Sequence, residues 1–295
     1  MSKSIVYFTK DISPEGIKRL YERLGAKLEG NVAAKVHSGE EGNQNFIPIS
    51  YFAPIVEELH ATIVETNTAY ESPRYQTDTH YALLKEHGFD IFPIEILDEK
   101  KPDLVLPVEH GLQLDKNYVG QGFEHYDSMI VLSHFKGHPM GGYGGALKQL
   151  SIGCASGEGK AYIHSGGVTV DRELCWKEGK GQVAFLEAMV DAAKSVIDYF
   201  KKKGGIAYVN VMKNMSVDCD CCSIAEDPCL KDIGVLASLD PVAIDKACMD
   251  LVEQSDDPGK AHFMERVNTR KGKHYLEEAG RLGLGSLDYE LICID

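Results

Sequence analysis

The sequence predicts an α/β fold, with a mainly parallel sheet, helical crossovers and two lobes around a cleft. Short β-branched runs alternate with longer stretches of helical periodicity, which is the pattern of parallel strands joined by helices. The chain has 295 residues, of which 43% are hydrophobic, so it can bury a large core and is near the size at which domains divide. We therefore expect an N-terminal lobe of residues 1–125 and a C-terminal lobe of residues 126–295.

Runs rich in β-branched and apolar residues mark the expected strands. These runs are residues 4–8, 32–37, 61–66, 104–108, 127–133, 205–212, 233–238 and 289–294. Helices are expected between them, over residues 13–24, 51–60, 74–87, 181–203, 241–254 and 272–282. Asp240 followed by Pro241 is typical of an N-cap and the first residue of a helix, which fixes the start of the helix over residues 241–254.

The charge balance argues against two classes of partner. The chain has 31 basic and 45 acidic residues and a formal net charge of −14, which repels nucleic-acid phosphates and anionic membrane surfaces. The first apolar run ends before Lys10, and no later stretch approaches the ~20 apolar residues of a spanning helix. We therefore expect a cytoplasmic protein that binds neither nucleic acid nor membranes. In that reducing compartment, clustered thiols bind metal more often than they form disulfides.

A glycine-rich segment follows the apolar strand over residues 127–133. It combines histidines, lysines and glycines: His134, Lys136, His138, Gly141, Gly142, Gly144, Gly145 and Lys148. The glycines let the backbone approach a ligand closely, and a helix beginning near Gly144 offers free N–H groups and a positive dipole end. The segment predicts a cationic site for a small anionic ligand. The alternative is a glycine-rich turn with solvated histidines.

Four of the eight cysteines fall within eleven residues after the strand over residues 205–212. They are Cys219, Cys221, Cys222 and Cys229. Thiolates are soft ligands that select zinc, copper(I) or iron–sulfur clusters. Because Cys221 and Cys222 are adjacent, they are awkward ligands for one tetrahedral ion, and the alternative to a metal site is a loop of reduced thiols. Cys248 and Cys293 are expected to pack in the core.

Two further loops leave the ends of expected strands. His37 follows the strand over residues 32–37 within a glycine-containing charged loop, and Thr66 and Asn67 follow the strand over residues 61–66. Parallel sheets collect ligands at the carboxyl ends of their strands, so we expect these loops and the glycine-rich segment to form one pocket. His37 is a candidate acid/base group, although an exposed turn residue fits the pattern equally well.

The segments KVHSGEEGN, ETNTAY, SHFKGHPMGGYGGALKQLSIGCASGEGK, the CDCC cluster and DIGVLASLDPVAID together resemble a known family. This is the family of uncharacterised iron–sulfur-centre proteins called domain of unknown function 362. Many of its members carry an inserted ferredoxin module with two CxxC-type motifs. Here the corresponding stretch retains only Cys175, so the chain resembles a short form without that module. The resemblance implies a metal centre, it leaves a redox partner open, and it does not imply a particular reaction.

A weaker resemblance connects the chain with the nickel-pincer lactate racemase family. Lys148 stands ten residues after His138, and His164 stands sixteen residues after Lys148, as in that family. The resemblance implies that Lys148 carries the nicotinate-derived cofactor, that His164 ligates nickel and that His138 is an acid/base group. The racemases have their second acid/base histidine directly after the strand that here ends at residues 65–68. None of these four residues is a histidine, so only His37 could replace it.

These observations leave three hypotheses open. In the first, the four cysteines of the cluster hold an iron–sulfur cluster or a single iron or zinc ion in a redox-type protein with a small-ligand cleft. In the second, the chain is an isomerase with a cofactor on Lys148. In the third, zinc only stabilises the fold of a binding protein. The sequence does not decide whether the chain is an enzyme.

Overall fold

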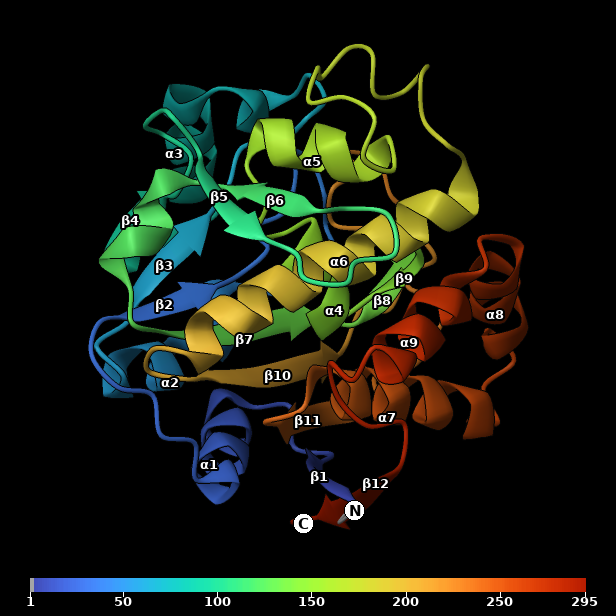
Figure 1. The fold of residues 1–295 in the computed structure, drawn as a ribbon. Helices are drawn as coiled ribbons and strands as arrows, with labels where there is room; N and C mark the ends of the chain where they lie inside the picture. Colours follow the sequence, from blue (N-terminus) through green and yellow to red (C-terminus); the bar gives the residue numbers. More distant parts are fainter. Residues whose placement is uncertain (1–2) are drawn as a thin grey trace.

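The computed structural model describes residues 3–295, and its centre is an eight-stranded sheet (Figure 1). The strand order is β12-β1-β11-β10-β7-β2-β3-β4. The strands are β1 Ser4–Thr9, β2 Val32–Lys35, β3 Thr62–Glu65, β4 Ile94–Ile96, β7 Ser128–His134, β10 Ile206–Met212, β11 Gly234–Ser238 and β12 Tyr289–Cys293. Only β11 runs antiparallel to its neighbours in this sheet. The predicted α/β fold with a mainly parallel sheet is therefore confirmed.

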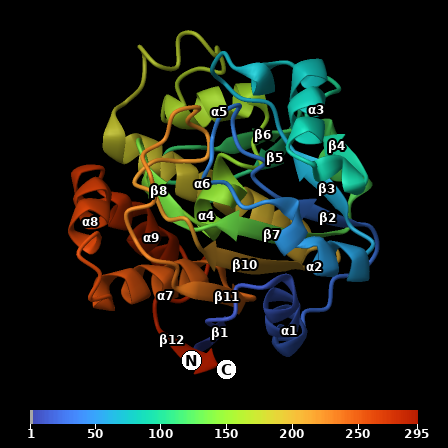
Figure 2. The same cartoon turned by 180° about the vertical axis from the view of Figure 1, so that it is seen from behind.

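Helices cover both faces of the sheet and enclose two hydrophobic cores. On the face toward the viewer in Figure 1 lie α4 Ala146–Ser151, α6 Gln182–Lys201, α7 Pro241–Gln254 and α9 Gly272–Arg281. The opposite face is covered by α1 Pro14–Leu24 and α2 Ala53–Glu58 (Figure 2). Tyr208 and Val209 are neighbours on β10 and belong to different cores, because successive side chains of a strand point to opposite faces. The strand pattern thus separates the two cores.

Capping residues explain why the ends of two helices, α1 and α7, could be predicted closely. The Asp240 side chain accepts hydrogen bonds from the backbone N–H groups of Val242 and Ala243, and Pro241 is the first residue of α7. Ser13 caps α1 in the same way, and Gly25 ends that helix in the left-handed conformation. The predicted helix over residues 241–254 is confirmed at both ends.

Several smaller elements were not predicted or were placed differently. The strand expected over residues 104–108 lies outside the main sheet: β5 Leu104–Pro107 pairs antiparallel with β6 Lys116–Val119. β8 Lys136–His138 and β9 Gly142–Gly144 form a second two-stranded sheet within the glycine-rich segment. The other helices are α3 Thr77–Glu86, α5 Gly157–His164 and α8 Lys260–Thr269, with short 3-10 helices η1 Ile49–Tyr51, η2 Pro73–Tyr75, η3 Phe89–Ile91 and η4 Gln121–His125. The short strands contain few residues, so they carry little periodic signal.

Both halves of the chain contribute strands to the main sheet. β1, from the N-terminal half, lies between β11 and β12 of the C-terminal half, and β2 pairs with β7. The proposed division between residues 125 and 126 therefore separates adjacent, hydrogen-bonded strands, and it stays a prediction.

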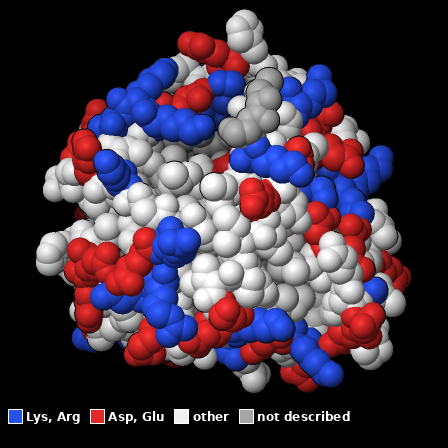
Figure 3. Space-filling view, turned by 90° about the horizontal axis from the view of Figure 1, so that it is seen from below, with Lys and Arg blue, Asp and Glu red and all other residues white. Residues whose placement is uncertain are grey.

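Figure 3 views the side of β1 and β12, where mixed charges surround a broad uncharged area. No helix within residues 3–295 is long and apolar enough to cross a membrane.

Candidate metal centre and ligand cavity

The loops after β2, β3 and β7 meet at one cavity of about 280 Å³. His37, Thr66 and His138, one from each loop, all line it. β2 pairs with both β3 and β7 in parallel, so the carboxyl ends of the three strands lie at the same edge of the sheet. The predicted convergence of these loops on one pocket is confirmed.

A group of three metal-ligand side chains lies at this cavity. One ligand atom from each of His138, Cys219 and Cys221 lies within 4.8 Å of the other two. Cys221 Sγ is 3.9 Å from His138 Nε2, and the backbone N–H of Cys221 donates to Cys219 Sγ at 3.3 Å. His138 and Cys221 line the cavity, and Cys219 is buried behind them. This His/Cys group can hold a metal ion.

Gly137 brings His138 next to the cysteines. Its backbone N–H donates to Ser216 O at 2.8 Å, so β8 lies directly against the loop that carries Cys219 and Cys221. A Cβ atom on Gly137 would lie 2.3 Å from the carbonyl oxygen of Val217. Because no side chain fits there, glycine is required for this close approach of the two segments.

Charge controls the protonation of Cys219. Burial alone raises the pKa of the thiol, but a hydrogen bond from Cys221 and the positive charge of Lys148 hold that pKa well below its usual range. Lys148 is the third residue of α4, and its Nζ donates to Cys219 Sγ at 3.4 Å. Burial lowers the pKa of Lys148, but the sulfurs of Cys219 and Cys221 outweigh this and raise it. The lowered pKa favours the thiolate of Cys219, the form that binds metals.

The two histidines beside the thiolate are neutral. Burial, followed by the charge of Lys148, lowers the pKa of His138, and burial lowers the pKa of His37 to about 4. The Nδ1 atom of His138 accepts hydrogen bonds from the backbone N–H groups of Met140 and Gly141, at 3.2 and 2.7 Å. Nδ1 therefore has no proton in this arrangement, and Nε2, which faces Cys221, carries the proton.

His134 and Lys136 do not line the cavity, although the sequence analysis assigned them to the ligand site. Both bind the carboxylate of Asp220, His134 Nδ1 at 2.9 Å and Lys136 Nζ at 2.8 Å. Burial raises the pKa of Asp220, but the charges of His134 and Lys136 outweigh this and hold it well below its usual range. Since Asp220 stands between the two cysteines of the metal-ligand group, His134 and Lys136 fix that loop from behind.

The N-terminus of α4 is already occupied, which corrects the expectation of free N–H groups near Gly144. The backbone N–H groups of Ala146 and Leu147 donate to the carboxylate of Asp245 at 2.8 and 3.0 Å. A Cβ atom on Gly145 would lie 2.4 Å from the same carboxylate. The glycines at 144 and 145 thus make room for Lys148 and Asp245, and the helix terminus offers no anion site.

The four cysteines of the cluster do not converge. Cys229 Sγ lies 3.5 Å from Met215 O, and Cys229 is not part of the His138–Cys219–Cys221 group. Cys222 lines the cavity beside Cys221. Outside the cluster, Cys248 is buried as expected, whereas Cys293 is exposed because β12 is an edge strand. The expectation of core packing was therefore wrong for Cys293.

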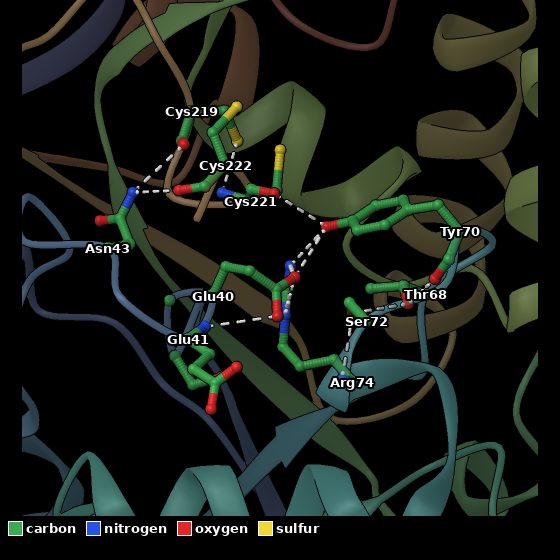
Figure 4. Close-up of polar contacts among 12 residues, drawn as sticks. Glu40, Glu41, Asn43, Thr68, Tyr70, Ser72, Arg74, Cys219, Cys221 and Cys222 are labelled. Carbon is green, nitrogen blue, oxygen red and sulfur yellow. Dashed lines mark hydrogen bonds and ion pairs between the residues drawn. The ribbon is translucent and has the colours of Figure 1, made fainter. Parts of the chain in front are cut away.

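A buried ion pair that the sequence pattern did not predict holds the cysteine loop (Figure 4). Arg74 Nε and Nη2 donate to Glu40 Oε2 at 3.2 and 3.1 Å, and both side chains are about 95% buried. Tyr70 Oη lies 3.1 Å from this carboxylate and 3.1 Å from Cys221 O. Charged residues in loops usually face solvent. The only sequence signal for Glu40 and Arg74 is that their loops follow two neighbouring strands, β2 and β3.

Asn43 provides a second link between the loops. Its Nδ2 donates to Cys222 O at 2.8 Å, while its Oδ1 accepts from the backbone N–H of Asn45. The backbone N–H of Glu40 donates to Asp220 O at 2.8 Å. In Figure 4 the sulfur atoms of the cysteine loop lie on the side away from Glu40 and Arg74. The contacts of Glu40, Tyr70 and Asn43 therefore form a clamp on the backbone of the loop, and the sulfurs lie on the opposite side.

Lys148 and His164 both line the cavity, Lys148 in the first turn of α4 as the spacing predicted. The ring of His164 stacks on Phe185 with centroids 4.8 Å apart and contacts Trp176. Burial lowers the pKa of His164 to about 3. Its Nδ1 is buried and has no hydrogen-bond partner in the described part of the chain. Aromatic packing alone therefore orients this imidazole.

Of the two predicted site residues after β3, Thr66 lines the cavity and Asn67 does not. Thr66 Oγ1 accepts from Lys160 Nζ at 2.5 Å and donates to Gly153 O at 3.0 Å, at the wall of the cavity. Asn67 does not line the cavity. Its side chain contacts Thr77 and His80 instead.

The fold and the site define an α/β protein with a His/Cys group at a ligand-sized cavity. The chain belongs to the family described as Domain of unknown function (DUF362), whose model matches residues 32–250. The predicted membership is thus confirmed. No curated protein matches the chain.

The solved structures that are similar to the chain include the following two. One is the lactate racemase apoprotein from Thermoanaerobacterium thermosaccharolyticum, with 12% identity, a TM-score of 0.42, and coverage of 70% of this chain and 50% of that one. The other is a protein from Thermotoga maritima, with 13% identity, a TM-score of 0.44, and coverage of 81% of this chain and 58% of that one. The chain thus spans half the length of the first protein and 58% of the length of the second.

Proposed function

We propose that the chain is a metal-binding protein that holds a single ion through Cys219, Cys221 and His138. The observation that carries this proposal is the gathering of the three ligand atoms within 4.8 Å of one another. Two sulfurs and one imidazole suit zinc or iron, and three protein ligands leave a coordination position open for water or a ligand. Because His138 and Cys221 line the cavity, that position faces the space where a small molecule can bind.

The donor set favours one ion over an iron–sulfur cluster. Clusters are usually held by four thiolates, and Cys229 is not part of the group here. The lowered pKa of Cys219 favours its thiolate, which is the form that a metal binds. His138 fits after one adjustment. Its proton must move from Nε2 to Nδ1, which breaks the hydrogen bonds from Met140 and Gly141.

Elemental analysis of protein purified without oxygen tests this proposal. The wild-type chain is expected to bind about one zinc or iron ion, and Cys219→Ser and Cys221→Ser are expected to lose it, because each removes a soft ligand. Cys229→Ser and the exposed Cys293→Ser are the matched controls and are expected to keep the ion. Loss of metal in Cys229→Ser, or retention in Cys219→Ser, would contradict the assignment.

A second candidate function is an enzyme with a nickel-pincer-type cofactor on Lys148. It is favoured by one observation: Lys148, His138 and His164 line the same cavity. The cofactor would supply hydride acceptance, with Lys148 as its attachment point, and the unpartnered Nδ1 of His164 leaves that ring free to act as a ligand. The contact of Lys148 with Cys219 favours the first candidate instead. Intact-mass measurement on protein from cells that make the cofactor separates the two, since only the second predicts a mass increase on Lys148.

A further inference from the structure

Four cationic side chains line the cavity, and three of them are paired. Their partners are close: Lys35 Nζ lies 2.5 Å from Glu65, Arg74 Nη2 lies 3.1 Å from Glu40, and Lys148 Nζ lies 3.4 Å from Cys219 Sγ. Each of these charges is therefore balanced within the protein.

Lys160 is the fourth, and its charge is not balanced in this way. It extends from α5 to the cavity wall and is only 7% exposed. Its Nζ donates to Thr66 Oγ1 at 2.5 Å and to Ala155 O at 2.7 Å, which are neutral acceptors. Among residues 3–295 no carboxylate lies within ion-pair distance of it. A buried ammonium without an anionic partner is unfavourable, so the position calls for an anion from outside the chain.

We propose that the cavity binds a small organic monoanion, whose carboxylate pairs with Lys160 and whose apolar part lies against Ile152, Met140 and Trp176. These three side chains line the same cavity, so the space combines one unbalanced positive charge with an apolar wall. The proposal rests on the proposed function in placing this ligand beside the metal ion. Lys160 itself belongs to a different element from the three metal-ligand residues.

The same features argue against phosphate as the natural ligand. A phosphate dianion requires several N–H donors or more than one unpaired cation. The N-terminus of α4 is occupied by Asp245, and the Thr66 hydroxyl already donates to Gly153 O. The volume of about 280 Å³ also suits a small acid better than a nucleotide.

Binding of such an anion should depend on pH. Burial lowers the pKa of Lys160 to about 7; Asp98 and Glu65 oppose this shift, and Lys35 and Arg74 add to it. A bound carboxylate favours the charged amine, so binding takes up a proton and weakens as the pH rises above 7. The affinity is expected to be about tenfold lower at pH 8 than at pH 6.

Four titratable groups near Lys160 have pKa values outside that range. The pKa of His80 is about 3 through burial, and burial likewise lowers the pKa of His164 to about 3. Burial raises the pKa of Cys154 to about 12. For Glu65, burial raises the pKa, but the charge of Lys35 outweighs this and keeps it far below its usual value. The pH dependence between 6 and 8 therefore reports on Lys160.

Calorimetric titration of metal-free and metal-loaded protein with butyrate and benzoate tests the proposal. We expect at least one of these acids to bind the wild-type chain, the neutral butyramide and benzamide not to bind, and Lys160→Met to weaken binding at least about tenfold. Lys160→Met should also raise the melting temperature, because it replaces a buried amine with an apolar side chain of similar length. The exposed Lys202→Met is the control and should bind as the wild type does.

Three results would overturn the proposal: equal binding by Lys160→Met, tighter binding of inorganic phosphate than of either acid, or no binding of either acid at pH 6. If Lys160→Met does not fold, Lys160→Gln provides the same comparison with a polar side chain. Metal content measured on the same preparations keeps the two proposals separate. Wild-type protein that binds metal but no acid contradicts only the inference about Lys160, and protein that binds acid but no metal contradicts only the metal site.

Discussion

At the candidate metal centre, burial and neighbouring charge compete to set the protonation state of each residue. For Cys219, burial favours the neutral thiol, and the hydrogen bond from Cys221 and the ammonium of Lys148 reverse that preference. The sequence pattern predicted Cys219, Cys221 and Lys148 as site residues, because soft and cationic groups rarely cluster without a ligand. Patterns did not predict Glu40 or Arg74, since burial of a loop charge depends on packing between distant segments. The pattern also predicted Cys229 as a ligand, but Cys229 is not part of the His138–Cys219–Cys221 group. Nearness in the sequence does not determine the direction in which a side chain points.

Lys148→Met should raise the pKa of Cys219 in metal-free protein, because it removes the positive charge 3.4 Å from the sulfur and keeps an apolar side chain in its place. Each unit of pKa increase corresponds to about 1.4 kcal/mol of lost thiolate stabilisation. The measurement is thiolate absorbance in the near ultraviolet as the pH is raised. The thiolate signal present at neutral pH should decrease in Lys148→Met and persist in Lys160→Met. An unchanged titration in Lys148→Met would show that Lys148 does not stabilise the thiolate.

The loop between β10 and β11 obtains its order from other elements. It has no helix or strand of its own, and side chains from the loops after β2 and β3 hold its backbone. Sequence patterns predicted the long strands and capped helices around it, because those depend on local periodicity and end signals. They could not predict the β8–β9 pair, because its strands have only three residues each and β8 lies against this distant loop.

Tyr70→Phe should weaken metal binding and leave the fold intact. The change removes the hydroxyl that lies 3.1 Å from Cys221 O and 3.1 Å from Glu40, and one lost hydrogen bond costs about 0.5–1.5 kcal/mol. The affinity for the ion, measured by competition with a chelator, should fall roughly 2–10-fold. Tyr162→Phe, which removes a hydroxyl from a more exposed pair with Asp115, is the control and should not change it. Equal affinities in both variants would mean that the clamp does not position Cys221.

The whole molecule is organised around one sheet that draws strands from both ends of the chain. The parallel α/β class could be predicted, because strands and helices alternate along the sequence. The order of the strands could not, since the insertion of β1 between β11 and β12 depends on pairing between residues more than 200 positions apart. The cavity follows from this order, because its walls come from loops that only the assembled sheet brings together.

Residues 1–125 and residues 126–295 should not fold when expressed separately. Without β1, the strands β11 and β12 lose their common partner, and β7 loses its pairing with β2. Each fragment would expose apolar strand edges, so we expect aggregation or non-cooperative melting, observed by circular dichroism, and refolding only when both are mixed. Cooperative unfolding of the fragment of residues 126–295 alone would instead support two independent domains.

X-ray absorption spectroscopy of the metal-loaded protein tests the central claim most directly, because it counts the ligands of the ion and identifies them. The proposed site predicts two sulfur neighbours at about 2.3 Å, from Cys219 and Cys221, and one imidazole nitrogen at about 2.0–2.1 Å, from His138. Three or four sulfur neighbours with metal–metal scattering would identify a cluster, and an ion without sulfur neighbours would place the metal elsewhere. Either of these spectra would contradict a single ion held by the His138–Cys219–Cys221 group.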